Sequence, residues 1–301
     1  MFDLPIALSG LFVGFIVGLT GMGGGALMTP LLVLLFGVQP LAAVSSDVVA
    51  SMIMKPFGGA VHWRRGTVHR GLVLWLMLGS VPSAFLGVLL LKSLGGEATL
   101  QGIVKHALGV ALLVVVAGLL TRPLLVRSRK AGDSSAPLLV KRWPTLLIGV
   151  LGGLVVGVTS VGSGSLMIVM LLLLYPRIRM SELVGTDLVQ AIPLVASAAL
   201  GHLLFGDFQL GLTTSILVGS IPGVFLGAQF SARAPDHVIR PALMVVLLGS
   251  GLKLLGVSSP LVVAISVVAA LGGIGYAIVV SQRLARERAA LSPSIGSTIP
   301  G

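Results

Sequence analysis

Long apolar segments separated by short polar stretches follow one another along most of this chain. A membrane-spanning helix needs about 20 mainly apolar residues to cross a hydrocarbon core about 30 Å thick. The chain lacks the alternation over about ten residues that marks transmembrane β-strands. The pattern therefore predicts an all-α polytopic membrane protein. Seven segments are predicted to be full spans, near residues 44–61, 71–91, 103–121, 183–201, 210–230, 238–255 and 261–280.

Two further apolar segments, residues 5–36 and 143–176, are each interrupted by glycines. The first break reads Gly18-Leu-Thr-Gly-Met-Gly-Gly-Gly-Ala-Leu-Met28, and the second reads Gly157-Val-Thr-Ser-Val-Gly-Ser-Gly-Ser-Leu-Met167. An arm from Ala26 to Phe36 would rise about 17 Å, which is about half of the hydrocarbon core. We therefore expect two helical hairpins with the breaks at their tips. Whether the hairpins are re-entrant or fully spanning is left open.

The two breaks belong to a repeat that relates the two halves of the chain. Asp47 and His62 recur as Asp187 and His202, and a Gly-Ser-x-Pro-x-x-x-Leu-Gly segment begins at both Gly79 and Gly219. The loop after His62 is basic and the loop after His202 is not, so the halves are predicted to be inverted. The predicted organisation is a first transmembrane repeat (1–121), a cytoplasmic linker (122–142), a second transmembrane repeat (143–255), an extra C-terminal span (256–282) and a cytoplasmic tail (283–301).

Composition and charge agree with a membrane protein. The chain is 55% hydrophobic and 10% charged, and its mean hydropathy is +1.09. All but four of its 20 lysines and arginines fall on one predicted side, the exceptions being Lys55, Lys92, Lys105 and Lys253. Basic loops remain in the cytoplasm. We therefore expect a protein of the inner (plasma) membrane, embedded in the lipid bilayer, with its N-terminus outside and its C-terminus cytoplasmic.

The same composition indicates which kinds of ligand and partner the protein is expected to lack. The net charge of +11 is explained by membrane topology, so no nucleic-acid partner is expected. The chain contains no cysteine, which excludes disulfides and thiolate metal sites. We expect no metal and no other cofactor. A homo-oligomer is compatible with the sequence, and the oligomeric state is left open.

Several motifs of this chain resemble those of a known family. They are Gly21-Met-Gly-Gly-Gly25 followed by Pro30, Val184-Gly-Thr-Asp-Leu188, and the two Gly-Ser-x-Pro segments. Together they are similar to the sulfite exporter TauE/SafE family over most of residues 8–255. The resemblance implies an inner-membrane permease that moves small anions, such as sulfite, other sulfur oxyanions and organosulfonates of the sulfoacetate type.

The glycine breaks are the first candidates for the substrate site. The first N–H groups of a helix have no partner within the helix, and its dipole favours a negative charge there. Glycine lets an anion approach such a terminus closely. For the glycines spaced four residues apart before each break, we favour the alternative that they only permit tight helix crossing. The predicted anion-binding residues at the breaks are Gly23, Gly24, Gly25, Ser163, Gly164 and Ser165.

Four polar residues within predicted spans complete the candidate site. Lys55 is a cation deep in an apolar span, which indicates an anionic substrate or an acidic partner. Gln190 lies one turn after Asp187 and is predicted to face the same cavity. Asp47 and Asp187 have two interpretations: they cap the first turn of their helices, or they bind a coupling proton. His62 and His202 are expected to be interfacial or loop residues.

These features predict a secondary transporter of a small anion that works by alternating access. The chain contains no Walker-type phosphate loop, so it is expected to use ion gradients. The alternatives are an anion channel, a membrane-embedded scaffold or a membrane-embedded enzyme. No base–nucleophile pair accompanies Lys55, Asp47 and Asp187, so we expect no catalytic residues and no enzyme activity.

Overall fold

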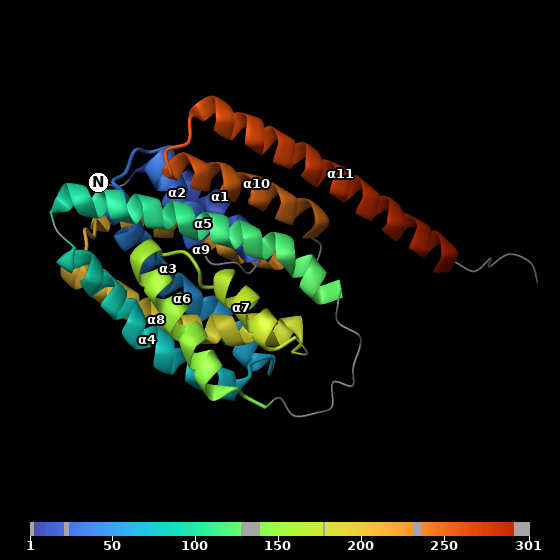
Figure 1. The fold of residues 1–301 in the computed structure, drawn as a ribbon, viewed down its shortest axis with the longest axis horizontal. Helices are drawn as coiled ribbons and strands as arrows, with labels where there is room; N and C mark the ends of the chain where they lie inside the picture. Colours follow the sequence, from blue (N-terminus) through green and yellow to red (C-terminus); the bar gives the residue numbers. More distant parts are fainter. Residues whose placement is uncertain are drawn as a thin grey trace, which may run out of the picture.

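The computed structural model describes residues 3–20, 24–94, 96–127, 139–176, 178–230 and 236–291. Within these ranges every regular element is a helix, and Figure 1 shows their arrangement. The helices are α1 (Leu4–Thr20), α2 (Gly25–Leu34), α3 (Pro40–Arg64), α4 (Arg70–Ser93), α5 (Glu97–Arg127), α6 (Arg142–Thr159), α7 (Leu166–Leu174), α8 (Met180–Phe205), α9 (Leu210–Phe230), α10 (Asp236–Leu254) and α11 (Ser259–Leu291).

Several of these helices have the length and composition to cross a bilayer. Five qualify among the described residues, and they lie in α4, α5, α6, α8 and α9. α3 is 25 residues long, but Asp47, Lys55 and Arg64 make it more polar than these five. The apolar stretches described in α10 and α11 are shorter, Pro241–Leu254 and Ser259–Gly275. The prediction of a polytopic helical membrane protein is confirmed.

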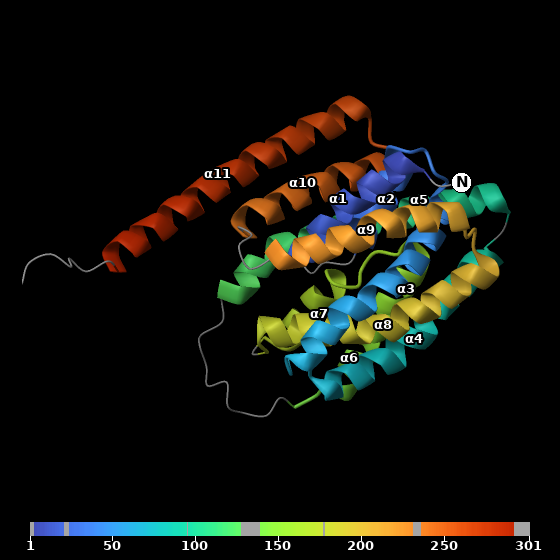
Figure 2. The same cartoon turned by 180° about the vertical axis from the view of Figure 1, so that it is seen from behind.

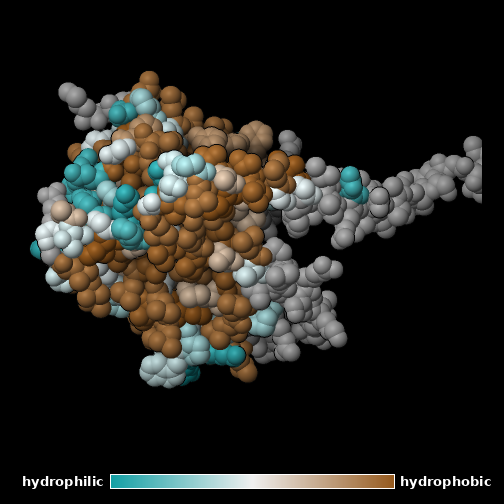
Figure 3. All heavy atoms as spheres, turned by 45° about the horizontal axis from the view of Figure 1, so that its top comes forward, coloured by the Kyte–Doolittle hydropathy of each residue, from teal (hydrophilic) through white to brown (hydrophobic). Residues whose placement is uncertain are grey.

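The outer surface carries large apolar side chains where a soluble protein would carry polar ones. On α4, Leu74, Leu78, Leu86 and Leu90 lie on one helical face and are each more than half exposed. Figure 3 shows hydrophobic residues over most of one face of the molecule, with hydrophilic residues gathered toward its edges. Exposed apolar surface of this extent marks contact with lipid.

Two helix pairs hold the repeats together through glycines. α1 packs along α9, and α6 packs along α4. A methyl group added at Gly10 would lie 2.8 Å from the Ile216 carbonyl oxygen of α9, and one added at Gly149 would clash with the Leu76 carbonyl of α4. These close approaches confirm tight helix crossing as the role of Gly10 and Gly149 among the glycines spaced four apart. The same holds for Gly14, Gly153 and Gly157.

The centre of the molecule is formed by α3 and α8, which Figures 1 and 2 show side by side. Ser45, near the start of α3, hydrogen-bonds His202, near the end of α8. Gly59, near the end of α3, lies against Leu188 and Ile192, nearer the start of α8. The two helices therefore run antiparallel. α5 packs against α10, and α11 covers α10 at one edge of the molecule.

As the hairpin prediction expects, each glycine break is flanked by two helices, which differ in length, although residues 21–23 of the first break lie outside the described residues. α2 has 10 residues and α7 has 9, so each is only about 15 Å long. Their partners α1 and α6 have 17 and 18 residues. α2 and α7, the second arms, are therefore too short to cross the hydrocarbon core, as predicted for Ala26–Phe36. α6 is long enough to cross it. Residues 161–165, between α6 and α7, are all buried inside the protein.

Two helices extend beyond their predicted ends. α5 continues to Arg127, into the predicted linker, and α11 continues to Leu291, into the predicted tail. The end of α11 reads Arg283-Leu-Ala-Arg-Glu-Arg-Ala-Ala-Leu291. Its Ala, Leu, Arg and Glu residues are strong helix formers, so a polar composition does not end the helix.

Candidate functional site

The two glycine breaks meet inside the protein. A methyl group added at Gly25, the first residue of α2, would clash with the carbonyl oxygen of Ser160 in the second break. Gly24 precedes α2 directly and is partly buried. Gly23, the remaining predicted site residue of the first break, lies outside the described residues. The start of α2 therefore packs against the second break, at the residue that follows α6.

The second break has an unusual backbone. Ser160 has φ 61° and ψ −7°, and it is the only non-glycine residue with positive φ in the described part of the chain. Gly162 and Gly164 follow with φ of 127° and 98°. A left-handed residue with a side chain costs about 1 kcal/mol or more and persists only where its surroundings hold it. Ser163 and Ser165 are buried beside these glycines.

Asp47 joins α2 to the second break. Its Oδ2 accepts hydrogen bonds of 2.8 Å from Thr29 Oγ1 on α2 and from Ser160 Oγ in the second break. The side chain is only 3% exposed. α3 begins at Pro40, so Asp47 lies two turns inside the helix and does not cap its first turn. The capping interpretation is wrong here because the apolar start of α3 extends further than the predicted span.

Lys55 reaches the second break from the other direction. Its Nζ donates a hydrogen bond to Ser163 Oγ, and the side chain is partly buried. Lys55 also interacts electrostatically with both Asp47 and Asp187. Asp47 and Lys55 lie eight residues apart on α3, which is close to two helical turns, so both face the breaks. One cation and two carboxylates therefore surround the break residues.

Asp187 and Gln190 form a second polar group on α8. Gln190 Nε2 donates to Asp187 Oδ1 at 3.0 Å and lies 2.8 Å from Met167 Sδ. Gln190 Oε1 accepts a 3.2 Å hydrogen bond from Ser80 on α4. The backbone N–H of Gly164 also interacts with the Asp187 carboxyl group. Asp187 and Gln190 therefore present their side chains in the same direction from α8, and the prediction that they share a substrate site remains a prediction.

α8 begins at Met180, so Asp187 lies beyond the first turn of its helix, as Asp47 does. Capping of the first turn is therefore also wrong for Asp187. Its carboxyl group instead interacts with the amide of Gly164, in the break just before α7. A negative charge at that terminus is favoured by the helix dipole.

Sequence reasoning missed three residues of this cluster. Thr29, Ser80 and Met167 supply contacts to Asp47 and Gln190 from neighbouring helices. Ser80 had a detectable signal, because it belongs to the repeated Gly-Ser-x-Pro segment. Thr29 and Met167 lie in apolar stretches, where nothing in the sequence distinguishes them from core residues.

The prediction that His202 is an interfacial or loop residue is wrong. It is fully buried, with Nδ1 2.9 Å from Ser45 Oγ and Nε2 2.8 Å from the Gly157 carbonyl oxygen. α8 packs against both α3 and α6 at this point, so a residue near the helix end still lies in the interior. His62 is partly buried and lies 3.0 Å from Thr67 Oγ1.

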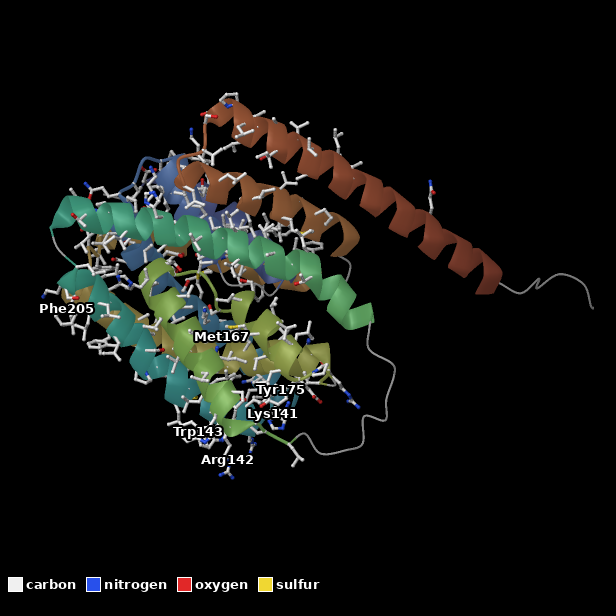
Figure 4. All side chains as sticks on the ribbon, viewed as in Figure 1. Lys141, Arg142, Trp143, Met167, Tyr175 and Phe205 are labelled. Carbon is white, nitrogen blue, oxygen red and sulfur yellow. The ribbon has the colours of Figure 1, made fainter. Side chains whose placement is uncertain are left out.

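Basic residues gather at one end of the helices. Arg70 lies over the Trp63 ring at 5.3 Å, and Arg142 lies over the Trp75 ring at 5.8 Å. Figure 4 shows Lys141, Arg142 and Trp143 at this end, well away from Phe205. Tryptophan is enriched at membrane–water interfaces. The tryptophans and basic residues of this end are of the types found near a membrane–water interface.

The chain matches the family model described as "Sulfite exporter TauE/SafE" over residues 6–254. It is 42% identical over 255 residues to the "Probable membrane transporter protein YjnA" of Bacillus subtilis (strain 168), covering 84% of this chain and 100% of that protein. A second protein of that organism, "Probable membrane transporter protein YdhB", is 27% identical over 81% of this chain and 96% of its own length.

A "Probable membrane transporter protein" of Xylella fastidiosa (strain 9a5c) is 27% identical over 77% of this chain and 87% of its own length. No solved structure matches the chain. The family match ends at the last residue of α10, so it contains both halves of the repeat and excludes α11. With this match and its membrane-spanning helices, the chain belongs to the sulfite exporter TauE/SafE family and is a multi-pass membrane transporter.

Proposed function

We propose that this transporter carries a small anion, of the sulfur oxyanion or organosulfonate class, in a site where the two helix breaks meet. The observation that carries the proposal is the contact of Lys55 with Ser163 in the second break. It brings a cation to the start of α7, where a helix terminus already favours negative charge. The family description, which names sulfite export, supports the substrate class.

The residues around the breaks suit an anion with several oxygen atoms. Lys55 supplies a positive charge, and Ser163 and Ser165 supply buried hydroxyl donors. Gly164 has its backbone amide at the Asp187 carboxyl group, and Gly25 packs closely against Ser160 of the same break because it has no side chain. Sulfite and sulfonate groups accept hydrogen bonds from such donors on several oxygens at once.

The charge balance of the site requires a proton. With Lys55 protonated and both Asp47 and Asp187 ionised, the cluster has a net charge of −1 before any substrate binds. This net negative charge would repel an anionic substrate, because charges in the protein interior are only weakly screened. A proton on one carboxyl group brings the cluster to neutrality, so we propose that anion binding is accompanied by proton uptake.

The way the repeats exchange partners supports alternating access as the mechanism. The first helix of each repeat packs on the fourth helix of the other, and the central helices α3 and α8 are antiparallel. Matched hydrogen bonds link the repeats: His69 N–H donates to Thr186 and Gln209 N–H donates to Ser46. This arrangement supports two inverted repeats, as in secondary transporters with broken helices.

The proposed orientation places the end with Arg64, Arg70 and Arg142 in the cytoplasm, with the N-terminus outside. Moving one negative charge out of a negative-inside cell gains about 2.3 kcal/mol per 100 mV. A monovalent anion that moves alone is therefore driven outward by the membrane potential, whereas an anion carried with the proposed proton has no net charge and can also be taken up.

Ligand-induced thermal stabilisation of the purified protein tests the proposal. A ligand that binds the native state stabilises it by about 2.7 kcal/mol at 100 times its Kd. Sulfite, thiosulfate or an organosulfonate should raise the unfolding temperature, and the Lys55→Met variant should lose that shift. Equal shifts for simple carboxylates, or shifts that persist in Lys55→Met, would contradict the proposed substrate class and site.

Flux measurements in proteoliposomes distinguish a carrier from the alternative of an anion channel. A carrier that works by alternating access should show saturable flux and exchange of labelled for unlabelled anion across the membrane. Currents far above carrier rates without such exchange would favour a channel.

A further inference from the structure

We propose that His202 is a positioning residue that acts as the latch of a gate. It holds α3, α6 and the loop between α8 and α9 together at one end of the binding site, and so keeps that end closed in the present structure. The inference rests on the alternating-access mechanism proposed above, because that mechanism requires a barrier on each side of the site. His202 lies near the end of α8, and its side chain is completely buried.

A directed chain of hydrogen bonds passes through His202. The Gly157 carbonyl oxygen can only accept, so His202 Nε2 carries the hydrogen and donates across 2.8 Å. In the neutral imidazole Nδ1 is then the acceptor, and Ser45 Oγ–H donates to it across 2.9 Å. Ser45 Oγ in turn accepts the backbone N–H of Asp207 at 3.2 Å. One neutral imidazole therefore connects four segments of the protein.

The loop between α8 and α9 is close-packed on this chain of bonds. A methyl group added at Gly206 would lie 2.6 Å from Ser45 Oγ and 2.8 Å from His202 Nδ1. The next residue of α3, Ser46, accepts the backbone N–H of Gln209 at 3.3 Å. Movement of the loop away from α3 would break these bonds together.

The chain of bonds lies directly beside the substrate site. Gly157 is in the last turn of α6, just before Ser160. Ser45 lies just before Asp47, which accepts the Ser160 hydroxyl. His202 therefore holds both sides of the Asp47–Ser160 contact at the end of the site opposite to Arg64.

The other end of the site cannot form the same latch. In the repeat that relates Asp47 to Asp187, Ser45 corresponds to Gly185 and His202 corresponds to His62. Gly185 has no hydroxyl group to offer a histidine. His62 lies instead 3.0 Å from Thr67 Oγ1, within its own segment, and is only partly buried.

The glycines of the two loops show the same asymmetry. Gly66 corresponds to Gly206, and among the described residues no atom lies within 4 Å of a methyl group added at Gly66. The Arg64 end does have the counterpart of the bond from Gln209 N–H to Ser46: His69 N–H donates to Thr186 Oγ1 at 3.0 Å. At the Arg64 end the loop is held by that bond and by packing of Thr67 on Gly185. Among the described residues, the histidine-centred chain of bonds is therefore present at the His202 end alone, which is the outer end in the proposed orientation.

Cysteine accessibility tests the latch without any need for a substrate. The chain contains no cysteine, so a single introduced thiol is the only label site. Ser51 is buried on the face of α3 that carries Asp47 and Lys55, and Ser51→Cys places a reporter between them. Its labelling by a membrane-impermeant maleimide is measured in right-side-out and inverted vesicles, with and without a second substitution.

His202→Ala should increase labelling from the latch side about tenfold, since losing two hydrogen bonds shifts the closed–open equilibrium by that order. Labelling from the opposite side should stay the same or fall. His62→Ala, the matched control, should leave latch-side labelling unchanged. Unchanged latch-side labelling in His202→Ala, or an equal increase from both sides, would overturn the proposal.

Ser45→Ala provides a second variant if His202→Ala fails to fold. It removes the hydroxyl at one end of the chain of bonds and leaves the imidazole in the core. Its effect on latch-side labelling should be smaller, and the double variant should add little to His202→Ala, because both break one network. Additive effects of the two substitutions on latch-side labelling would overturn the latch. Failure of the substrate proposal would appear instead in the ligand-binding measurements with Lys55→Met.

Discussion

Asp47 accepts a 2.8 Å hydrogen bond from Ser160, although 113 residues separate them in the chain. The bond crosses from the central helix of the first repeat to the glycine break of the second. Ser160 needs a left-handed backbone at this point. The contact therefore combines backbone strain with a buried carboxyl group at the point where the two repeats meet.

Two substitutions of Ser160 should separate its backbone from its hydroxyl group. Ser160→Gly relieves the left-handed strain and should leave the unfolding free energy nearly unchanged, because glycine offsets the lost hydrogen bond. Ser160→Ala keeps the strain and leaves Asp47 short of a donor, so it should destabilise by about 1–3 kcal/mol. Both should weaken anion transport. Thermal unfolding and proteoliposome flux measure the two effects, and equal stability of the variants would contradict the strain argument.

Removal of the Lys55 charge should abolish anion transport while the protein still folds. Lys55→Met retains the length of the apolar stem but loses the charge that contacts Ser163. The matched control is Lys253→Met. Lys253 is an exposed lysine near the end of α10, and its Nζ hydrogen-bonds Ser259 at the start of α11. Transport is measured in proteoliposomes, and folding is checked by size-exclusion chromatography. Normal transport in Lys55→Met would remove this residue from the site.

The affinity for the anion should rise as the pH falls, because the proposed binding step takes up a proton. Asp187 is the expected proton acceptor, since its carboxyl group interacts with the Gly164 amide at the place where the anion would bind. Protonation of Asp187 would release that amide for the substrate. Asp187→Asn should therefore bind the anion with an affinity that no longer depends on pH.

Binding isotherms at several pH values provide the measurement for this prediction. Asp207→Asn is the control, because Asp207 lies in the loop between α8 and α9 and outside the polar cluster. Asp47→Asn tests whether the other carboxyl group takes the proton instead. An unaltered pH dependence in all three variants would show that neither carboxyl group of the cluster couples the proton.

Glycine substitutions should show where the repeats are held together. A methyl group at Gly219 would clash with the Ala7 carbonyl group, so Gly219→Ala should destabilise by about 1–3 kcal/mol or prevent folding. Gly272 lies in α11, and no described atom is within 4 Å of a methyl group added there. Gly272→Ala should stabilise slightly through helix propensity, by about 0.5–1 kcal/mol. Unfolding temperatures in detergent compare the two, and similar values would contradict the packing of α1 on α9.

Local sequence patterns were sufficient to predict the membrane helices, the two breaks and the polar residues within the spans. Hydropathy reports whether a segment leaves water, and it requires no knowledge of its neighbours. The repeated aspartates and the isolated Lys55 stood out because charge is rare and costly in an apolar span. These features are properties of one segment at a time.

Only the tertiary structure decided which of these residues touch. Thr29 and Met167 join the site because α2 and α7 lie beside α3 and α8, and His202 is buried because α8 crosses α3 and α6. The meeting of Gly25 with Ser160 likewise depends on how two distant hairpins pack. Hydropathy is the sum of local transfer free energies, whereas a hydrogen-bond partner is chosen by the direction in which packed helices present their side chains.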